Sequence, residues 1–170
     1  MRDCVIGLDF LHSNNIVHRD IKPLNIMLDE YGKAKYADFG ASEMLDNLAD
    51  GDMFQDTKGT YQFLSPEAVD PKVNSYSGKA TDVWALGVTM YALTFNQLPF
   101  SGDTDPEVVE CILTKDLQIP DNRNSSEGLT NLIKRLLDKN PKSRITIAEL
   151  KSNEWLNEGF HYSLNAPEAT

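Results

Sequence analysis

The chain has 170 residues, of which 41% are hydrophobic, so we expect one domain of ordinary size with a buried core. Its formal net charge is -10, which argues against a general binder of nucleic acid or anionic membranes, because such partners need a basic surface. Cys4 and Cys111 form no CxxC pair and no cluster with the histidines, so a zinc site is not expected. One disulfide between them stays open, although free thiols in a reducing compartment fit better.

The sequence also indicates a compartment. No apolar run approaches the length of a membrane span. The first residues, from Met1 to Val5, lack the apolar core of a signal peptide. We therefore expect a cytosolic or nuclear protein without a membrane partner.

The first half of the chain predicts one helix and one hairpin. Residues 4 to 13 are apolar at helical spacing. Residues 26 to 28 and 34 to 37 read as two short strands, joined by a turn at 29 to 32. Residues 41 to 65 are polar and irregular, and loops of that length inside compact domains are usually functional.

The second half is predicted to be helical. A helix from Thr81 onward is apolar nearly all round, which is typical of a helix at the centre of a domain. Another helix spans roughly 107 to 114. A third carries an i, i+3, i+4, i+7, i+8 stripe, formed by Leu129, Leu132, Ile133, Leu136 and Leu137. The last begins with a capping box at Thr146 and Glu149 and ends near Trp155.

Together these elements predict an α+β fold that is mostly helical, with a strand hairpin near its start. The domain is expected to cover residues 1 to 156. Residues 157 to 170 are expected to form a loose tail. No internal repeat or low-complexity tract divides the chain further.

The first chemical constellation is the run HRDIKPLN at residues 18 to 25. Phosphoryl transfer needs charge and positioning more than covalent help. Asp20 could orient an attacking hydroxyl and accept its proton, Lys22 could neutralise the transferring group, and Asn25 could help to hold magnesium. Taken alone, an HRD triplet in a loop is more often a solvated turn.

A second constellation, Asp38-Phe39-Gly40, directly follows the second predicted strand. A carboxylate at a strand end, beside a permissive glycine, can reach a metal ion. Magnesium prefers one or two carboxylates together with phosphate oxygens and waters. Alone, these three residues are common and carry little information.

The order and spacing of these groups resemble the eukaryotic protein kinase signature, HRD-x-x-x-x-N, then a strand, then DFG, then an activation loop closing in A-P-E. The closing triplet is Ser65-Pro66-Glu67, preceded by Gly59-Thr60. Residues 82 to 87, DVWALG, look like the kinase D-x-W-x-x-G helix, and Arg144 stands where the family keeps an arginine for Glu67. The similarity runs from about residue 4 to residue 156.

The resemblance implies the C-terminal, or large, lobe of a Ser/Thr protein kinase that uses ATP and magnesium on a protein substrate. Lys22, two residues after Asp20, follows the Ser/Thr pattern rather than the tyrosine kinase pattern. Residues 37 to 42 and 98 to 100 are similar to the calcium/calmodulin-dependent kinase kinases and their relatives. Calmodulin, which that subgroup suggests as a partner, has no supporting segment in these residues.

Four residues are expected to be structural in such a lobe: His18, Glu67, Asp82 and Arg144. Glu67 and Arg144 could form an exposed ion pair, which contributes little, or a buried pair as in the family. Asp82 could simply cap a helix, or could bind the backbone around His18 and Arg19 as the family does.

The resemblance places regulation in the loop at 41 to 65. Thr57, three residues before Thr60, is the predicted phosphosite for an upstream kinase, and Arg19 could pair with the phosphate. Asp56 stands where many kinases have their phosphothreonine, so it could supply part of that charge without modification.

The substrate platform is expected between Gly59-Thr60 and the closing triplet. Its apolar members should line the site for the substrate residue after the acceptor; they are Tyr61, Phe63 and Leu64. Two departures from the family pattern occur nearby. Ser65 replaces the alanine of A-P-E, and Tyr36 takes a place usually held by Val, Ile or Leu, where its ring should be harder to bury.

No G-x-G-x-x-G and no strand-borne lysine precede Asp20, so we expect that the small lobe is absent from these residues and that they are inactive alone. Two functions stay open. The chain could be the catalytic part of an active Ser/Thr kinase, completed by a small lobe, or a non-catalytic large-lobe module that binds substrates or kinase partners. A pure scaffold has no physical need of Asp20, Lys22, Asn25 and Asp38, and this favours the first.

Overall fold

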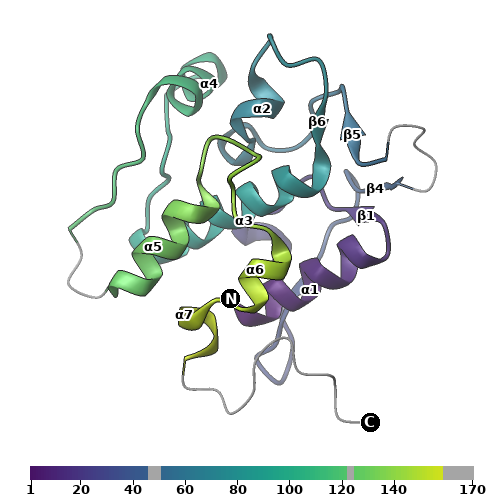
Figure 1. Cartoon of the computed structure of the whole chain (residues 1–170), viewed down its shortest axis with the longest axis vertical. Coiled ribbons are helices and arrows are strands. Elements are labelled where there is room, and N and C mark those ends of the chain that lie inside the picture. The colour runs from purple at the N-terminus through teal and green to yellow at the C-terminus, as the bar shows by residue number, and fades with distance from the viewer. Residues whose placement is uncertain (46–50, 122–124, 159–170) are drawn as a thin grey trace.

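The computed structural model describes residues 1–45, 51–121 and 125–158. At its centre lies α3 (Gly78–Phe95), the helix that the sequence predicts to be buried (Figure 1). The Ser77 hydroxyl accepts a hydrogen bond from the Ala80 N–H and caps its start. At its other end the C-cap residue is Asn96, whose left-handed backbone (φ 53°) suits a short polar residue. The helix carries apolar side chains on nearly every side, and these are buried because other elements pack around it.

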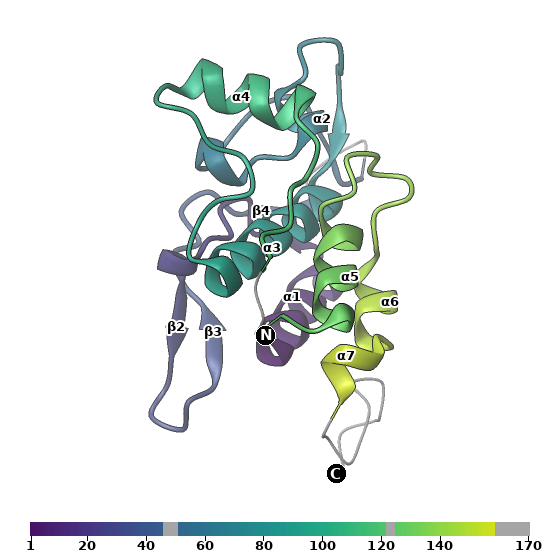
Figure 2. The ribbon, with the colours of Figure 1, turned by 90° about the vertical axis from the view of Figure 1, so that its left-hand side faces the viewer.

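Helices that precede and follow α3 in the sequence contribute side chains to the same buried core. They are α1 (Arg2–Ser13), α4 (Asp105–Thr114), α5 (Glu127–Leu136), α6 (Ile147–Lys151) and α7 (Glu154–Asn157). In Figure 2, α1 and α5 lie beside α3, while α4 packs with α2 (Pro66–Val69) at the far end. The sequence predicts the ends of α1, α4 and α5 to within three residues. It also predicts the start of α6, but α6 is shorter than expected.

The prediction of one helix from Thr146 to near Trp155 is wrong. The capping box at Thr146 and Glu149 is present, but α6 ends at Lys151 and a second helix, α7, follows. The side chain of Asn153 accepts a hydrogen bond from the Leu156 N–H, so it acts as the N-cap of α7. A local side-chain cap therefore replaces the continued helix.

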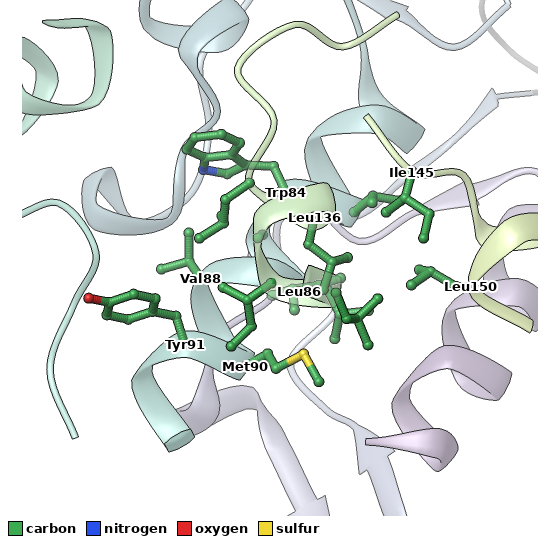
Figure 3. Close-up of a cluster of buried hydrophobic side chains, with 14 of the residues drawn as sticks. Trp84, Leu86, Val88, Met90, Tyr91, Leu136, Ile145 and Leu150 are labelled. Atoms are coloured by element: carbon green, nitrogen blue, oxygen red, sulfur yellow. The ribbon is translucent and has the colours of Figure 1, made fainter. Parts of the chain in front are cut away.

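The main core lies between α3 and α5 (Figure 3). Trp84 is fully buried and stacks on Phe100, with ring centroids 5.8 Å apart. Gly87 explains how the two helices approach so closely: a Cβ added there would lie 2.7 Å from the Leu136 Cβ. Ile145 and Leu150 extend this core towards α1 and α6.

Three small antiparallel sheets occur within the described part of the chain. Their strands are β1 (Ile16–Val17) with β4 (Glu43–Met44), β2 (Ile26–Leu28) with β3 (Ala34–Tyr36), and β5 (Met53–Phe54) with β6 (Tyr76–Ser77). The predicted hairpin is β2–β3, and it projects from the helical body in Figure 2. The fold is α+β, as predicted.

Residues 41 to 65 are less irregular than predicted. Strands β4 and β5 and the 3-10 turn Tyr61–Phe63 lie within them, while residues 46–50 are outside the described part. These strands were missed because two-residue pairings leave no alternation to detect. Most of the predicted tail, from residue 159, is also outside the described residues; α7 extends to Asn157.

Two further observations concern the chain as a whole. Cys4 is buried and Cys111 is half-buried, and both are free thiols. Among the residues that the structure describes, no helix combines the length and the apolar character needed to cross a bilayer.

Candidate active site

The HRD loop is anchored by a carboxylate from the central helix. Asp82, only 1% exposed, accepts the backbone N–H of His18 at 2.8 Å and that of Arg19 at 2.9 Å. Its Oδ2 also lies 2.9 Å from Nε2 of His12 on α1. Arg19 has φ 67°, a left-handed conformation that costs energy for a side chain of this size. The bonds to Asp82 hold the loop in that conformation.

His18 connects this loop to the segment before the DFG triplet. Its side chain is fully buried. Nδ1 faces the Asp20 N–H at 3.3 Å, and because an N–H can only donate, Nδ1 is the acceptor. Nε2 then carries the proton and donates to the Ala37 carbonyl at 3.1 Å. The ring also lies 5.0 Å from that of Phe39.

The Asp20 carboxylate lies at the centre of a hydrogen-bond network. Oδ1 accepts from the Thr60 hydroxyl at 2.8 Å, and Oδ2 accepts from Lys22 Nζ at 2.7 Å and from Asn25 Nδ2 at 3.1 Å. Lys22 also donates to the Thr60 oxygen at 2.8 Å. Burial acts to raise the pKa of Asp20, but the bonds from Lys22 and Thr60 outweigh it and lower the pKa. The group is therefore an ionised carboxylate near neutral pH, ready to orient a hydroxyl.

Asn25 belongs to this network, and Asp38 lies on the segment that is bonded to it through Ala37. The side-chain N–H group of Asn25 donates to the Asp20 carbonyl at 2.8 Å, and its buried amide is thereby oriented. The Ala37 N–H donates to the Asn25 carbonyl at 2.9 Å, which ties the start of the DFG segment to the HRD loop. Asp38 is exposed and has φ 58°, and its Oδ1 accepts from the Gly40 N–H at 3.2 Å.

This donor set fits magnesium. One amide oxygen and one exposed carboxylate are hard oxygen donors, and they leave room for the phosphate and water ligands that magnesium keeps. Asn25 and Asp38 are thus the residues that could hold a nucleotide-bound metal ion.

Arg19 contacts the activation loop through Asp56. Its Nη2 lies 2.8 Å from Asp56 Oδ1 and donates to the Asp56 carbonyl at 2.9 Å, and Nη1 lies 3.1 Å from Glu43 Oε2. The guanidinium stands 4.3 Å above the ring of Phe54. The hydrogen bond from Arg19 lowers the pKa of Asp56. Thr57 is exposed and instead donates to the Ala68 carbonyl at 3.0 Å, so the aspartate, not the threonine, meets Arg19.

Glu67 and Arg144 form a buried, two-pronged pair, with N–O distances of 2.6 and 2.9 Å. Arg144 also donates to the carbonyls of Ala80 and Asp138, and its guanidinium lies 5.0 Å from the Trp84 ring centroid. Of the two alternatives, the exposed pair is therefore wrong. The pair fastens the end of the activation segment to the helical core.

The predicted substrate residues divide into two groups. Phe63 and Leu64 line a small cavity next to Asp20 and Thr60. Tyr61, which is 41% exposed, lines a different groove together with Val69, Val73 and Val109. The structure therefore does not bring all three apolar side chains to one pocket.

Several residues at the site were missed by sequence reasoning. His12 and Glu43 carry no local signal, because their partners Asp82 and Arg19 lie far away in the sequence. Tyr36, whose ring was expected to be harder to bury, is only partly buried. Its hydroxyl donates to the Cys4 carbonyl at 3.0 Å, so the ring packs on α1 with its polar end satisfied.

Comparison with known proteins gives consistent matches. Residues 1–156 match the family model described as protein kinase domain. The chain is 41% identical over 166 residues to a probable serine/threonine-protein kinase of Dictyostelium discoideum, covering 96% of this chain and 23% of that protein. It is 38% identical over 162 residues to the serine/threonine-protein kinase ppk34 of Schizosaccharomyces pombe, covering 95% and 44%.

A third relative is the calcium/calmodulin-dependent protein kinase kinase cmkC of Emericella nidulans. It is 37% identical over 158 residues, which cover 92% of this chain and 30% of that protein. The chain thus spans less than half the length of each of these three relatives.

Proposed function

Because this chain belongs to the protein kinase domain family, we propose that its residues carry the phosphoryl-transfer step of a Ser/Thr protein kinase. In that reaction the γ-phosphoryl group of ATP moves to the oxygen of a protein Ser or Thr hydroxyl, the hydroxyl proton passes to a base, and ADP leaves. The single observation that carries the proposal is the ionised Asp20 carboxylate, held by Lys22, Thr60 and Asn25.

Each residue of this network has a role that its contacts support. Asp20 orients the substrate hydroxyl and takes its proton. Lys22, placed against Asp20 and Thr60, brings positive charge to the transferring group. Asn25 and Asp38 would hold magnesium, which neutralises the phosphate charge when bound. Thr60 keeps Asp20 and Lys22 in register by bonding to both.

A chimera tests this assignment. Residues 1–156 would replace the matching segment of the fission-yeast kinase ppk34, and transfer of radiolabelled phosphate to a protein substrate would be measured. Asp20→Asn and Asp38→Asn should each lower the rate by about a hundredfold or more while leaving the fold intact, since each removes one charge needed in the transition state. Lys35→Gln, an exposed change on β3, is the control and should leave turnover unchanged. Full turnover in either Asp variant would refute the proposal.

We further propose that these 170 residues transfer phosphate only when another unit covers the nucleotide. Large apolar side chains near the catalytic loop are exposed: Leu24 is 84% exposed, Met27 58% and Leu28 71%. Exposed apolar area of this kind usually marks a contact surface. The alternative function, a non-catalytic module, uses the same surface to bind a partner.

The activity of the chimera separates these functions, and calorimetry tests whether the chain alone binds the nucleotide. The chain alone should bind magnesium-ATP weakly or not at all, and should show only background phosphate transfer. The chimera should be active if the catalytic proposal is right, and inactive if the chain is a binding module.

The contact between Arg19 and Asp56 supports a proposal about how the activation loop is regulated. We infer that Asp56 supplies in unmodified form the charge that many kinases take from a phosphate, and that phosphorylation of Thr57 adds to it once the Thr57 side chain leaves the Ala68 carbonyl. Mass spectrometry and activity of the chimera test this inference. The unphosphorylated protein should be active, and Asp56→Ala should lower activity until Thr57 is modified; an unmodified protein indifferent to Asp56→Ala would contradict it.

A further inference from the structure

Tyr36 lies at the end of β3, two residues before Asp38, and points towards α1. Its hydroxyl donates to the Cys4 carbonyl at 3.0 Å. Its ring lies 5.5 Å from the His18 ring, centroid to centroid. The side chain therefore bridges α1 and the catalytic loop, although it touches no reacting atom.

Gly7 on α1 is matched to this ring. A Cβ added at Gly7 would lie 3.2 Å from both Cδ2 and Cε2 of Tyr36, which is closer than ordinary van der Waals contact. Alanine is otherwise preferred to glycine inside a helix. The glycine thus allows the ring to rest directly on the helix backbone, and any side chain there would move the ring by a few tenths of an ångström.

His18 contacts both the Tyr36 ring and Asp20, so a shift of the ring can displace Asp20. Its ring contacts two others, those of Tyr36 and Phe39, with centroid distances of 5.5 and 5.0 Å. Its Nδ1 accepts the Asp20 N–H at 3.3 Å. Because His18 is fully buried, its ring cannot yield to one neighbour without pressing on another.

We propose that Tyr36, seated on Gly7, is a positioning residue that fixes Asp20 through His18. This inference rests on the proposed function for its kinetic consequence, but not for its structural one. An ordinary core side chain would affect global stability alone. A positioning residue must alter Asp20 even where stability is preserved.

Gly7→Ala is the decisive variant, and Gly128→Ala is its matched control. Gly128, at the start of α5, would also place a Cβ 3.1 Å from an aromatic side chain, that of Trp155, but far from the catalytic loop in the sequence and in the fold. In the full 170-residue chain, Gly7→Ala should speed hydrogen exchange of the Asp20 amide about tenfold and shift the His18 ring ¹⁵N signals. Gly128→Ala should change neither. The melting temperature of Gly7→Ala should stay near that of the parent.

A double variant tests whether Gly7→Ala acts through the Tyr36 ring. Gly7→Ala combined with Tyr36→Leu removes the ring that the new methyl group displaces, so its Asp20 exchange should match that of Tyr36→Leu alone. In the active chimera, Gly7→Ala should lower kcat about tenfold with an unchanged KM for protein substrate, because small misplacements of a catalytic group act on the chemical step. If Gly7→Ala does not fold, Tyr36→Leu decides by the same Asp20 exchange measurement.

The proposal is overturned if Asp20 exchange and the His18 signals stay unchanged in Gly7→Ala or, where that variant does not fold, in Tyr36→Leu. It is equally overturned if both glycine variants accelerate Asp20 exchange alike, which would mean general loosening. A chimera without any transfer would refute the proposed function and leave the exchange result standing by itself.

Discussion

Two arginine–carboxylate pairs hold the activation segment, and they differ in their exposure to water. Arg144 and Glu67 are both buried, with side chains 1% and 7% exposed. Arg19 is equally buried, at 3%, but its partner Asp56 is 52% exposed. The same chemical contact therefore occurs once inside the protein and once at its boundary.

This difference in exposure determines how costly it is to break each pair. A buried pair cannot lose one partner cheaply, because the remaining charge has no water to solvate it. The Arg19–Asp56 pair can open at lower cost, because water then solvates the exposed Asp56 and Glu43 still pairs with the buried Arg19. The first pair is suited to permanent fastening, and the second to regulation.

The largest expected effect comes from breaking the buried pair. Glu67→Gln should lower the free energy of unfolding by about 3–5 kcal/mol, because it leaves Arg144 charged and unpaired in the core. Urea denaturation followed by circular dichroism measures this. Replacing both partners, Glu67→Leu with Arg144→Met, should recover most of the loss; a double variant as unstable as the single one would contradict the argument.

A smaller effect, of opposite sign, is expected beside Glu67. The Ser65 hydroxyl is buried and, within the part of the chain that the structure describes, has no hydrogen-bond partner. Ser65→Ala should raise the free energy of unfolding by about 1 kcal/mol, since an unpaired buried hydroxyl is costly. Equal or lower stability in the same denaturation experiment would show that the hydroxyl is satisfied.

The Arg19–Asp56 pair should contribute less to the free energy of unfolding. Asp56→Asn should lower the free energy of unfolding by about 1 kcal/mol or less. The loss should shrink in 0.5 M sodium chloride, because salt screens exposed charges, whereas the loss from Glu67→Gln should not. A salt-independent effect of Asp56→Asn would erase the distinction between the two pairs.

The smallest effect concerns pH. The folded pKa of Asp56 lies below its usual value of 3.8, owing first to the hydrogen bond from Arg19. Its stabilisation is therefore complete above pH 3.8 and is lost as the pH falls through the lower folded pKa. Between pH 5 and pH 2, the melting temperature should fall less steeply with pH for Asp56→Asn than for the parent. Parallel curves would show that the pair does not form in solution.

The sequence predicts those parts of the molecule that depend on local pattern. The buried α3, the stripe on α5 and the β2–β3 hairpin follow from periodicity and turn residues, and the order of motifs identifies the family. The break at Asn153 could not be predicted, because a helix and a capped restart have the same apolar spacing there.

The contacts within the site are less predictable for a physical reason. Asp82 pairs with His12, and Glu43 with Arg19, across gaps of 70 and 24 residues. Nothing in a local pattern reports such distances. The contact of Arg19 with Asp56 rather than Thr57 depends on the conformation of the segment after β5, where Phe54 packs on Tyr76 and the Tyr76 hydroxyl donates to the Asp56 carbonyl.

The anchoring of the HRD loop by Asp82 also bears on the order of folding. The loop residues His18 and Arg19 precede their acceptor by 64 and 63 residues. Contacts between such distant residues close large loops, and they form late compared with local helices. During synthesis, the segment that carries Asp20 leaves the ribosome well before the aspartate that gives it shape. The geometry of the HRD loop is thus acquired only after the central helix has been made, because a nascent chain without Asp82 lacks the carboxylate that anchors the loop.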